Sequence, residues 1–207
     1  MEETSFKVET ELILNGFSCV GGVDEVGRGA LAGPVTAAVT AFAPDIDEGL
    51  VSEVTDSKLL TPKKREKLSN EIRELAVVCS VGSCSAEEVD EYGIVVATKK
   101  AMLRAIADSI RQPDFLLVDA LDLTEAKIPF QSIIKGDQKS RSIAAASIVA
   151  KVSRDMEMSN ISSLYGGYGF ERNKGYGTRE HMIALSEKGP SPIHRRSFAP
   201  VSKAMKS

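Results

Sequence analysis

Residues 22–34 of the chain read GVDEVGRGALAGP, and in this stretch two acids run directly into a glycine-rich turn. The residues before them, Cys19 to Val23, are typical of a short strand, so Asp24 and Glu25 stand where a strand ends. The glycines that follow allow the backbone to approach a ligand closely. This combination suits a metal ion that holds a phosphate, whereas the simpler alternative is a surface turn with solvated acids.

The sequence beyond this stretch alternates strand patterns with helix patterns. We expect further strands at residues 33–42, 77–84, 114–119 and 130–134, and helices at residues 62–76, 85–111 with an interruption near Gly93, 139–162 and 178–188. The glycine turn joins the first two strands, which predicts a hairpin-like pair. This order of elements predicts an α/β fold with a mixed sheet and helices on both faces.

Three helix starts carry local signals. Thr61 before Pro62 is typical of an N-cap followed by proline at the first helical position. Ser85 and Glu88 have the spacing of a capping box. Asp137, in KGDQKS, is a candidate cap for the long helix that follows it.

Composition indicates a globular protein. The 207 residues are 43% hydrophobic and 27% charged, which fits one domain over residues 1–207. No apolar run reaches the roughly 18 residues that a membrane span requires, and the first residues are acidic where a secretory signal is basic, so we expect a cytoplasmic protein. Three cysteines and two histidines predict reduced thiols and no structural zinc site.

Charge is divided unevenly along the chain, although the net charge is only −3. Residues 1–119 hold 12 basic and 21 acidic side chains, whereas residues 120–207 hold 14 basic and 8 acidic ones. A basic part beside clustered acids suits a metal-dependent enzyme that acts on a polyanion, because basic side chains hold phosphates while carboxylates hold cations. A chance imbalance explains the division equally well.

Four acids at strand or helix ends are candidate metal ligands: Asp24, Glu25, Asp119 and Asp137. Neighbouring side chains on a regular strand point to opposite faces, so the first two share a site only if the backbone departs from strand geometry. Four converging carboxylates repel one another unless cations neutralise them. Oxygen ligands without histidine or cysteine favour Mg²⁺ or Mn²⁺. As alternatives, Asp119 simply ends a strand and Asp137 caps a helix.

Several blocks together resemble the successive signatures of ribonuclease HII, the bacterial type 2 ribonuclease H. These blocks are GVDEVGRGALAGPV, DSKLLTPKKRE, LLVDAL, IKGDQKSRSIAAASIVAKVSRD, NKGYGTREH and PIHRRSF, and they follow the order of that family from about residue 20 to residue 201. The resemblance implies a ribonuclease H-like fold with a small C-terminal helical part over about residues 165–207. Val26 and Asn173 depart from the alanine and histidine that are common in the family.

The resemblance also implies an activity and its residues. The activity is endonucleolytic cutting of RNA in RNA–DNA hybrids, and on the 5′ side of single ribonucleotides in duplex DNA, which leaves 3′-hydroxyl and 5′-phosphate ends. Such an enzyme serves ribonucleotide removal from DNA and RNA primer removal. The residues are Asp24, Glu25, Asp119 and Asp137 for two divalent ions, Gly27, Arg28 and Gly29 for the ribose 2′-hydroxyl, and Tyr176 for the sugar of the following deoxynucleotide. Nothing demands more than a monomer.

Other assignments remain open from the sequence alone. Lys58, Lys135, Lys139 and Arg28 are candidate phosphate contacts or solvated charges. Tyr176 could cover the core, and His181 and His194 are expected to be structural or surface residues. Dinucleotide binding is disfavoured because the turn reads G-x-G-x-x-x-G and carries two acids. A basic nucleic-acid-binding module without catalysis leaves the four acids unexplained.

Overall fold

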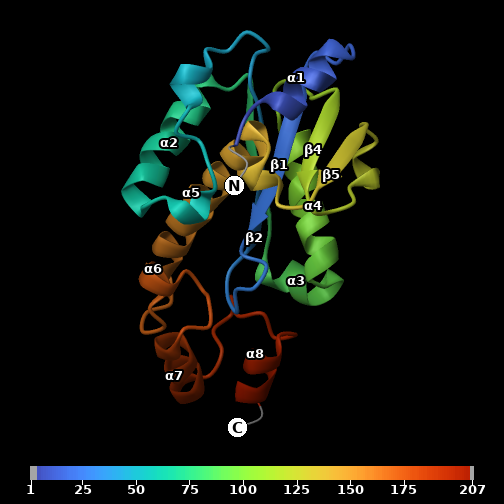
Figure 1. Cartoon of the computed structure of the whole chain (residues 1–207). Helices are drawn as coiled ribbons and strands as arrows, with labels where there is room; N and C mark the ends of the chain where they lie inside the picture. The colour runs from blue at the N-terminus through green and yellow to red at the C-terminus, as the bar shows by residue number, and fades with distance from the viewer. Residues whose placement is uncertain (1–3, 206–207) are drawn as a thin grey trace.

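The computed structural model describes residues 4–205 and contains one mixed sheet between layers of helices (Figure 1). Its five strands are β1 (Val20–Val26), β2 (Val35–Ala41), β3 (Val78–Cys84), β4 (Phe115–Asp119) and β5 (Phe130–Ile133), in the spatial order β3-β2-β1-β4-β5. The pairs β1–β2 and β2–β3 are antiparallel, whereas β1–β4 and β4–β5 are parallel. The expected mixed sheet and the antiparallel pairing of the first two strands are confirmed.

The helices in the described part are α1 (Lys7–Leu14), α2 (Pro62–Leu75), α3 (Ala86–Tyr92), α4 (Ile94–Ala107), α5 (Arg141–Leu164), α6 (Phe170–Asn173), α7 (Arg179–Lys188) and α8 (Ala199–Ala204). Thr61 caps α2 by accepting from the Lys64 amide at 3.3 Å, and Ser85 and Glu88 form the capping box of α3. Gly93, with φ of 76°, separates α3 from α4 as expected. Helices α1, α6 and α8 were not predicted.

The cap of α5 differs from the prediction. Ser140 immediately precedes the helix, and its hydroxyl accepts from the Ile143 amide at 3.1 Å. Asp137 lies in a short 3₁₀ turn, Gly136–Gln138, ahead of that cap. The alternative role of Asp137 as a helix cap is therefore ruled out, because Ser140 takes that position, and Asp137 stays a candidate metal ligand.

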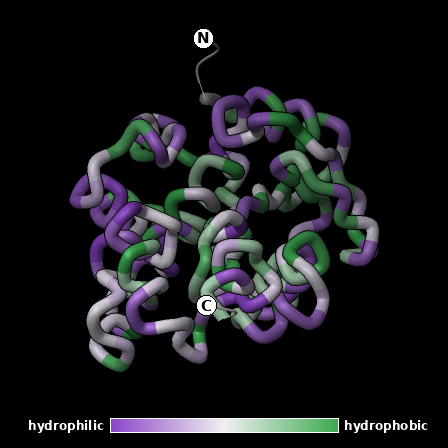
Figure 2. Tube along the Cα trace, turned by 90° about the horizontal axis from the view of Figure 1, so that it is seen from below, coloured by the Kyte–Doolittle hydropathy of each residue, from purple (hydrophilic) through white to green (hydrophobic). Residues whose placement is uncertain are grey.

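Helices α5 and α4 cover opposite faces of the sheet, α5 against β1 and β2, and α4 against β2 and β3. Small side chains let α5 approach closely, and a Cβ on Gly22 of β1 would lie 2.2 Å from the Ser142 carbonyl carbon. In the view from below, hydrophobic stretches run through the middle and hydrophilic ones dominate the outer turns (Figure 2). The core therefore has one apolar layer on each side of the sheet.

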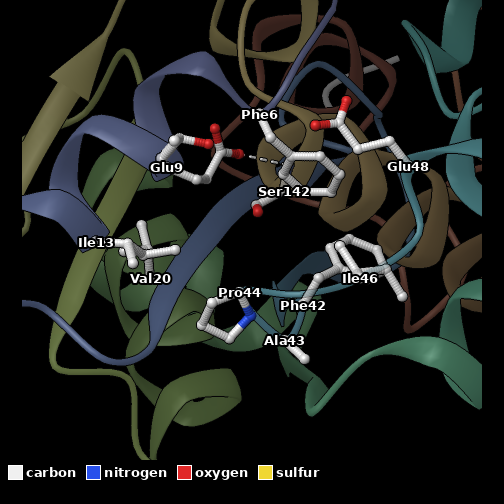
Figure 3. A pocket seen from close by; sticks show the side chains of 11 residues that line it. Phe6, Glu9, Ile13, Val20, Phe42, Ala43, Pro44, Ile46, Glu48 and Ser142 are labelled. Atoms are coloured by element: carbon white, nitrogen blue, oxygen red, sulfur yellow. Dashed lines mark hydrogen bonds between the residues drawn. The ribbon is translucent and has the colours of Figure 1, made fainter.

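Helix α1 is attached to the beginning of α5 by a buried acid. Glu9 Oε1 accepts from the Ser142 amide at 2.9 Å and from the Ser140 hydroxyl at 2.7 Å. A carboxylate is favoured there because the first turn of a helix presents unpaired amides. Figure 3 shows Glu9 facing Ser142 on the wall of a pocket that Phe6 and Phe42 also line. This pocket shares no lining residue with the acidic pocket described below.

The C-terminal part contains α6, which packs beside α5, and α7 and α8, which lie at the lower end of the molecule in Figure 1. Phe170 and Ala184 pack there with Ala32, and Leu185 and Val201 pack with Leu31. The C-terminal helical part is thus attached to the loop that follows β1. Within residues 4–205, no helix is long and apolar enough to cross a membrane.

Candidate active site

The candidate site lies where two parallel strands separate. The ladder between β1 and β4 ends with the pair Val23 and Val118. Asp24 and Glu25 follow on β1, and Asp119 follows on β4, so all three acids emerge at the same opening. Ligands gather at the carboxyl ends of neighbouring strands in such sheets, and the structure brings these strands together as the site requires.

The four acids converge on this opening from three parts of the chain. Asp24, Glu25 and Asp119 line one pocket of about 320 Å³. Asp137 is buried beside it, and the Lys58 ammonium, which lines the pocket, lies 3.1 Å from Asp137 Oδ2. The turn that carries Asp137 is linked directly to β4, because the Gly136 amide donates to Asp119 Oδ1 at 2.7 Å.

The backbone at the two adjacent acids differs from the expectation. Strand β1 keeps a regular register with β2 as far as Val26, which pairs with Thr36, so the expected departure from strand geometry is absent. Asp24 and Glu25 nevertheless line the same pocket. Beyond Val23 no residue of β4 pairs with β1, so the strand end is open where these two acids stand.

Electrostatics at the site resist accumulation of negative charge. Burial raises the pKa of Asp24 well above its ordinary value, and the charges of Glu25 and Asp119 raise it further, while the Ser147 hydroxyl and the Glu25 amide oppose them. Burial also raises the pKa of Glu25, against the effect of Arg28, whose guanidinium lies 3.2 Å from Glu25 Oε1. Raised carboxyl pKa values in a cleft are typical of functional sites and show that a cation there is favourable.

The donor set fits divalent ions. Glu25 Oε2 is buried and has no hydrogen-bond partner among the described residues, so an acceptor is left for a cation. Within residues 4–205, no three acidic, histidine or cysteine side chains already enclose one point closely enough to hold an ion. Lys58 and Arg28 instead neutralise Asp137 and Glu25. Ion binding therefore requires the carboxylates to turn toward one another.

The other predicted residues surround the acids. Gly27, Arg28 and Gly29 form the loop after β1, in which Gly29 is exposed and Gly27, with φ of 91°, is buried against Arg154. Tyr176 lines the same pocket as the acids. Its loop is joined to the first one, because the Leu31 amide donates to the Gly175 carbonyl at 2.8 Å. Lys135 and Lys139 are exposed and do not line the pocket.

Sequence reasoning did not single out four further residues of the pocket wall: Ser57, Arg65, Ser147 and Lys151. Ser147 and Lys151 are four apart on α5 and therefore share a helix face, a spacing that could have identified them. The backbone is also strained beside the site. Ala120, Lys135 and Lys174 have positive φ and stand one or two residues from Asp119, Asp137 and Tyr176. Such strain is concentrated at functional sites.

Comparison with known proteins agrees with this geometry. Residues 21–201 match the sequence model of the family described as Ribonuclease HII. The chain is 51% identical to ribonuclease HII of Desulfitobacterium hafniense over 98% of its length and 77% of the relative, and 48% identical to that of Ligilactobacillus salivarius over 98% and 78%. The crystal structure of ribonuclease H2 from Pyrococcus horikoshii superimposes with a TM-score of 0.79 at 28% identity, over 91% of this chain and 97% of that one.

Proposed function

We propose, since the chain belongs to the ribonuclease HII family, that it cuts on the 5′ side of ribonucleotides in duplex DNA. Members of this family are divalent-metal-dependent endoribonucleases of the ribonuclease H type, and so is this chain. RNA in RNA–DNA hybrids is its second substrate. Water adds to the phosphorus, the bond to the 3′ oxygen breaks, and the ends are a 3′-hydroxyl and a 5′-phosphate. Removal of ribonucleotides and RNA primers from DNA is the role that follows. The observation that carries the proposal is the opening between β1 and β4, where Asp24, Glu25 and Asp119 line one pocket and Asp137 is buried beside it.

Asp24, Glu25, Asp119 and Asp137 are the residues that would hold two Mg²⁺ or Mn²⁺ ions. When bound, a pair of divalent ions activates the attacking water and stabilises the leaving 3′ oxygen. The Glu25 amide donates to Asp24 Oδ1 at 2.7 Å, and the Gly136 amide donates to Asp119 Oδ1 at 2.7 Å. These contacts hold two of the four carboxylates at the opening before any ion arrives, so fewer side chains have to turn when ions bind.

Substrate recognition is assigned to the exposed loop and to Tyr176. A ribose differs from a deoxyribose by one hydroxyl, which can donate and accept hydrogen bonds. The backbone of Gly27, Arg28 and Gly29 can approach that hydroxyl, because space beside Gly29 is open. The Tyr176 ring packs on the next sugar, and the Lys58 ammonium, which is mostly exposed, is available to a phosphate.

A nicking assay tests this function. Purified protein with Mg²⁺ or Mn²⁺ is expected to nick a labelled DNA duplex at its single ribonucleotide, to cut an RNA–DNA hybrid, and to leave an all-DNA duplex intact. Excess EDTA is expected to stop both cuts. Full activity in EDTA would refute the assignment of the acids, and chelator-resistant binding without cutting would indicate a binding module.

Gly29→Ala is expected to lower the rate at a single ribonucleotide by about tenfold, because the new methyl group occupies the space that the ribose must enter. Folding should be unaffected, since a Cβ at Gly29 meets no atom within 4 Å. Rates and melting temperatures are compared with those of Gly166→Ala, whose Cβ also points into open space, away from the site. An unchanged rate in Gly29→Ala contradicts close approach of the ribose to this loop.

A further inference from the structure

A chain of hydrogen bonds runs behind Tyr176 and connects it to the 191–195 segment, which reads Ser-Pro-Ile-His-Arg. His181 Nδ1 lies 2.9 Å from the Tyr176 carbonyl oxygen, and His181 Nε2 lies 3.0 Å from His194 Nε2. His194 Nδ1 lies 2.9 Å from the Ser191 amide nitrogen and 2.8 Å from its hydroxyl. Both imidazoles are buried.

The direction of this chain fixes both tautomers. A backbone amide can only donate, so His194 Nδ1 accepts from Ser191 and the proton of that ring is on Nε2. His194 Nε2 therefore donates to His181 Nε2, and His181 Nδ1 donates to the Tyr176 carbonyl. Burial lowers the pKa of both rings, and His181 lowers that of His194 further, to about 4. Both histidines are thus neutral at neutral pH. The chain of hydrogen bonds requires neutral rings, because each ring accepts at one nitrogen and donates at the other.

The surroundings hold the two rings in place. The ring of Phe170 packs against His181 with centroids 5.3 Å apart, and the ring of Tyr168 packs against His194 at 5.0 Å. If either imidazole rotated, it would lose this packing against the aromatic rings, and its hydrogen bonds would break. The Tyr176 carbonyl therefore has one favoured position relative to the 191–195 segment.

The same segment also holds the loop after β1. The fully buried Arg195 donates from Nη1 to the Arg28 carbonyl at 2.9 Å and from Nε to the Gly33 carbonyl at 3.0 Å. Its own amide donates to the Leu31 carbonyl at 2.8 Å. Consecutive residues, His194 and Arg195, thus fix the two elements to which substrate recognition is assigned.

We propose that His181, His194 and Arg195 are positioning residues that set the spacing between the loop of Gly27, Arg28 and Gly29 and the Tyr176 ring, and thereby set selectivity for a ribonucleotide followed by a deoxynucleotide. This inference rests on the proposed function, in which the loop contacts one sugar and the ring packs on the next. Adjacent sugars have a fixed separation, so a fixed spacing between the two contacts favours one kind of junction. A displaced ring packs less closely on a deoxyribose and discriminates less against a second 2′-hydroxyl.

The selectivity is measured as the ratio of single-turnover rates on two substrates, a duplex with one ribonucleotide and an all-RNA hybrid. His181→Phe removes both hydrogen bonds of the ring and is expected to lower this ratio by about tenfold. His181→Asn, whose amide can still donate near the position of Nδ1, is expected to recover part of the loss. A merely structural role would lower both rates equally and leave the ratio unchanged, which would overturn the proposal. If His181→Phe does not fold, the ratio of the two rates is measured in His181→Asn and in Arg195→Lys instead. An unchanged ratio in both variants would overturn the proposal.

A double-mutant cycle with Tyr176→Ala separates this inference from the function on which it rests. If His181 acts through the ring, His181→Phe has no further effect on the ratio once the ring is absent. Additive effects would overturn the inference. An unchanged ratio in Tyr176→Ala alone would instead remove the proposed sugar contact. If the ratio is lowered in Tyr176→Ala but unchanged in His181→Phe, only the positioning role is refuted, and the sugar contact of Tyr176 stands.

Discussion

Asp119→Asn is expected to slow nicking at a single ribonucleotide by about a hundredfold or more, because it removes one negative charge from the centre of the site. The local hydrogen bond should survive, since an amide oxygen can accept from the Gly136 amide as the carboxylate does at 2.7 Å. Single-turnover rates with saturating Mg²⁺ provide the measurement. Asp122→Asn is the matched control, because Asp122 is an exposed acid three residues further on that pairs with Lys99. Equal rates in the two variants would remove Asp119 from the metal site.

The same variant has a second expected result in the absence of metal. Burial raises the pKa of Asp119 by more than the hydrogen bond from Gly136 lowers it. A carboxyl with a raised pKa favours the folded state while it is protonated, and this contribution is lost as the pH rises through the folded value. At neutral pH the ionised group therefore costs stability, so Asp119→Asn should melt no lower than the parent protein. The difference should vanish below about pH 4.

Gly22→Ala is expected to destabilise the protein by about 3 kcal/mol, because α5 lies too close to β1 to accommodate a methyl group. The new Cβ would lie 2.2 Å from the Ser142 carbonyl carbon and 2.3 Å from the Ile143 nitrogen, and both atoms belong to the backbone. Relief therefore requires the start of α5 to move, and rotation of a side chain cannot provide it. Urea unfolding with and without Mg²⁺ measures the loss.

The control for this experiment is Gly166→Ala, in which a Cβ meets no atom within 4 Å and the backbone needs no positive φ. It should change the free energy of unfolding by less than about 0.5 kcal/mol. Because α5 also carries Ser147 and Lys151, which line the pocket together with Asp24, Gly22→Ala should lose activity together with stability. A stable and active Gly22→Ala protein would contradict the close packing of β1 and α5.

Local signals in the sequence predicted the elements well. The caps at Thr61 and Ser85 each depend on residues three positions apart, and both are present in the structure. At the start of α5 the sequence offered Asp137 as a possible cap, whereas Ser140, which was not considered, takes that role. Helix α1 was missed because its eight residues are too few to be stable alone, and its attachment depends on contacts between Glu9 and residues more than 130 positions away.

The candidate site was only partly predictable. The four acids, the loop after β1 and Tyr176 were recognised from their motifs, but no sequence pattern showed that β4 pairs with β1 and then separates from it. A structural place for His181 and His194 was one of the two expectations, but their hydrogen bonds to each other and to Tyr176 were not predicted, for the same reason. These residues are 13 positions apart, and their contact exists only because the 191–195 segment folds back against the loop after β1. Long-range contacts of this kind leave no periodic signal.

The parallel pairing of β1 with β4 also bears on synthesis of the protein. A ribosome releases β1, β2 and β3 early, and these can join as an antiparallel meander, whereas Phe115, the partner of Val20, emerges much later. Until then the nascent meander exposes one unpaired edge of β1, a template for association with other chains. Asp24 and Glu25 place two carboxylates at the end of that edge, and edge charges of this kind discourage foreign strands. The acids to which metal binding is assigned would thus first protect the unfinished chain from aggregation.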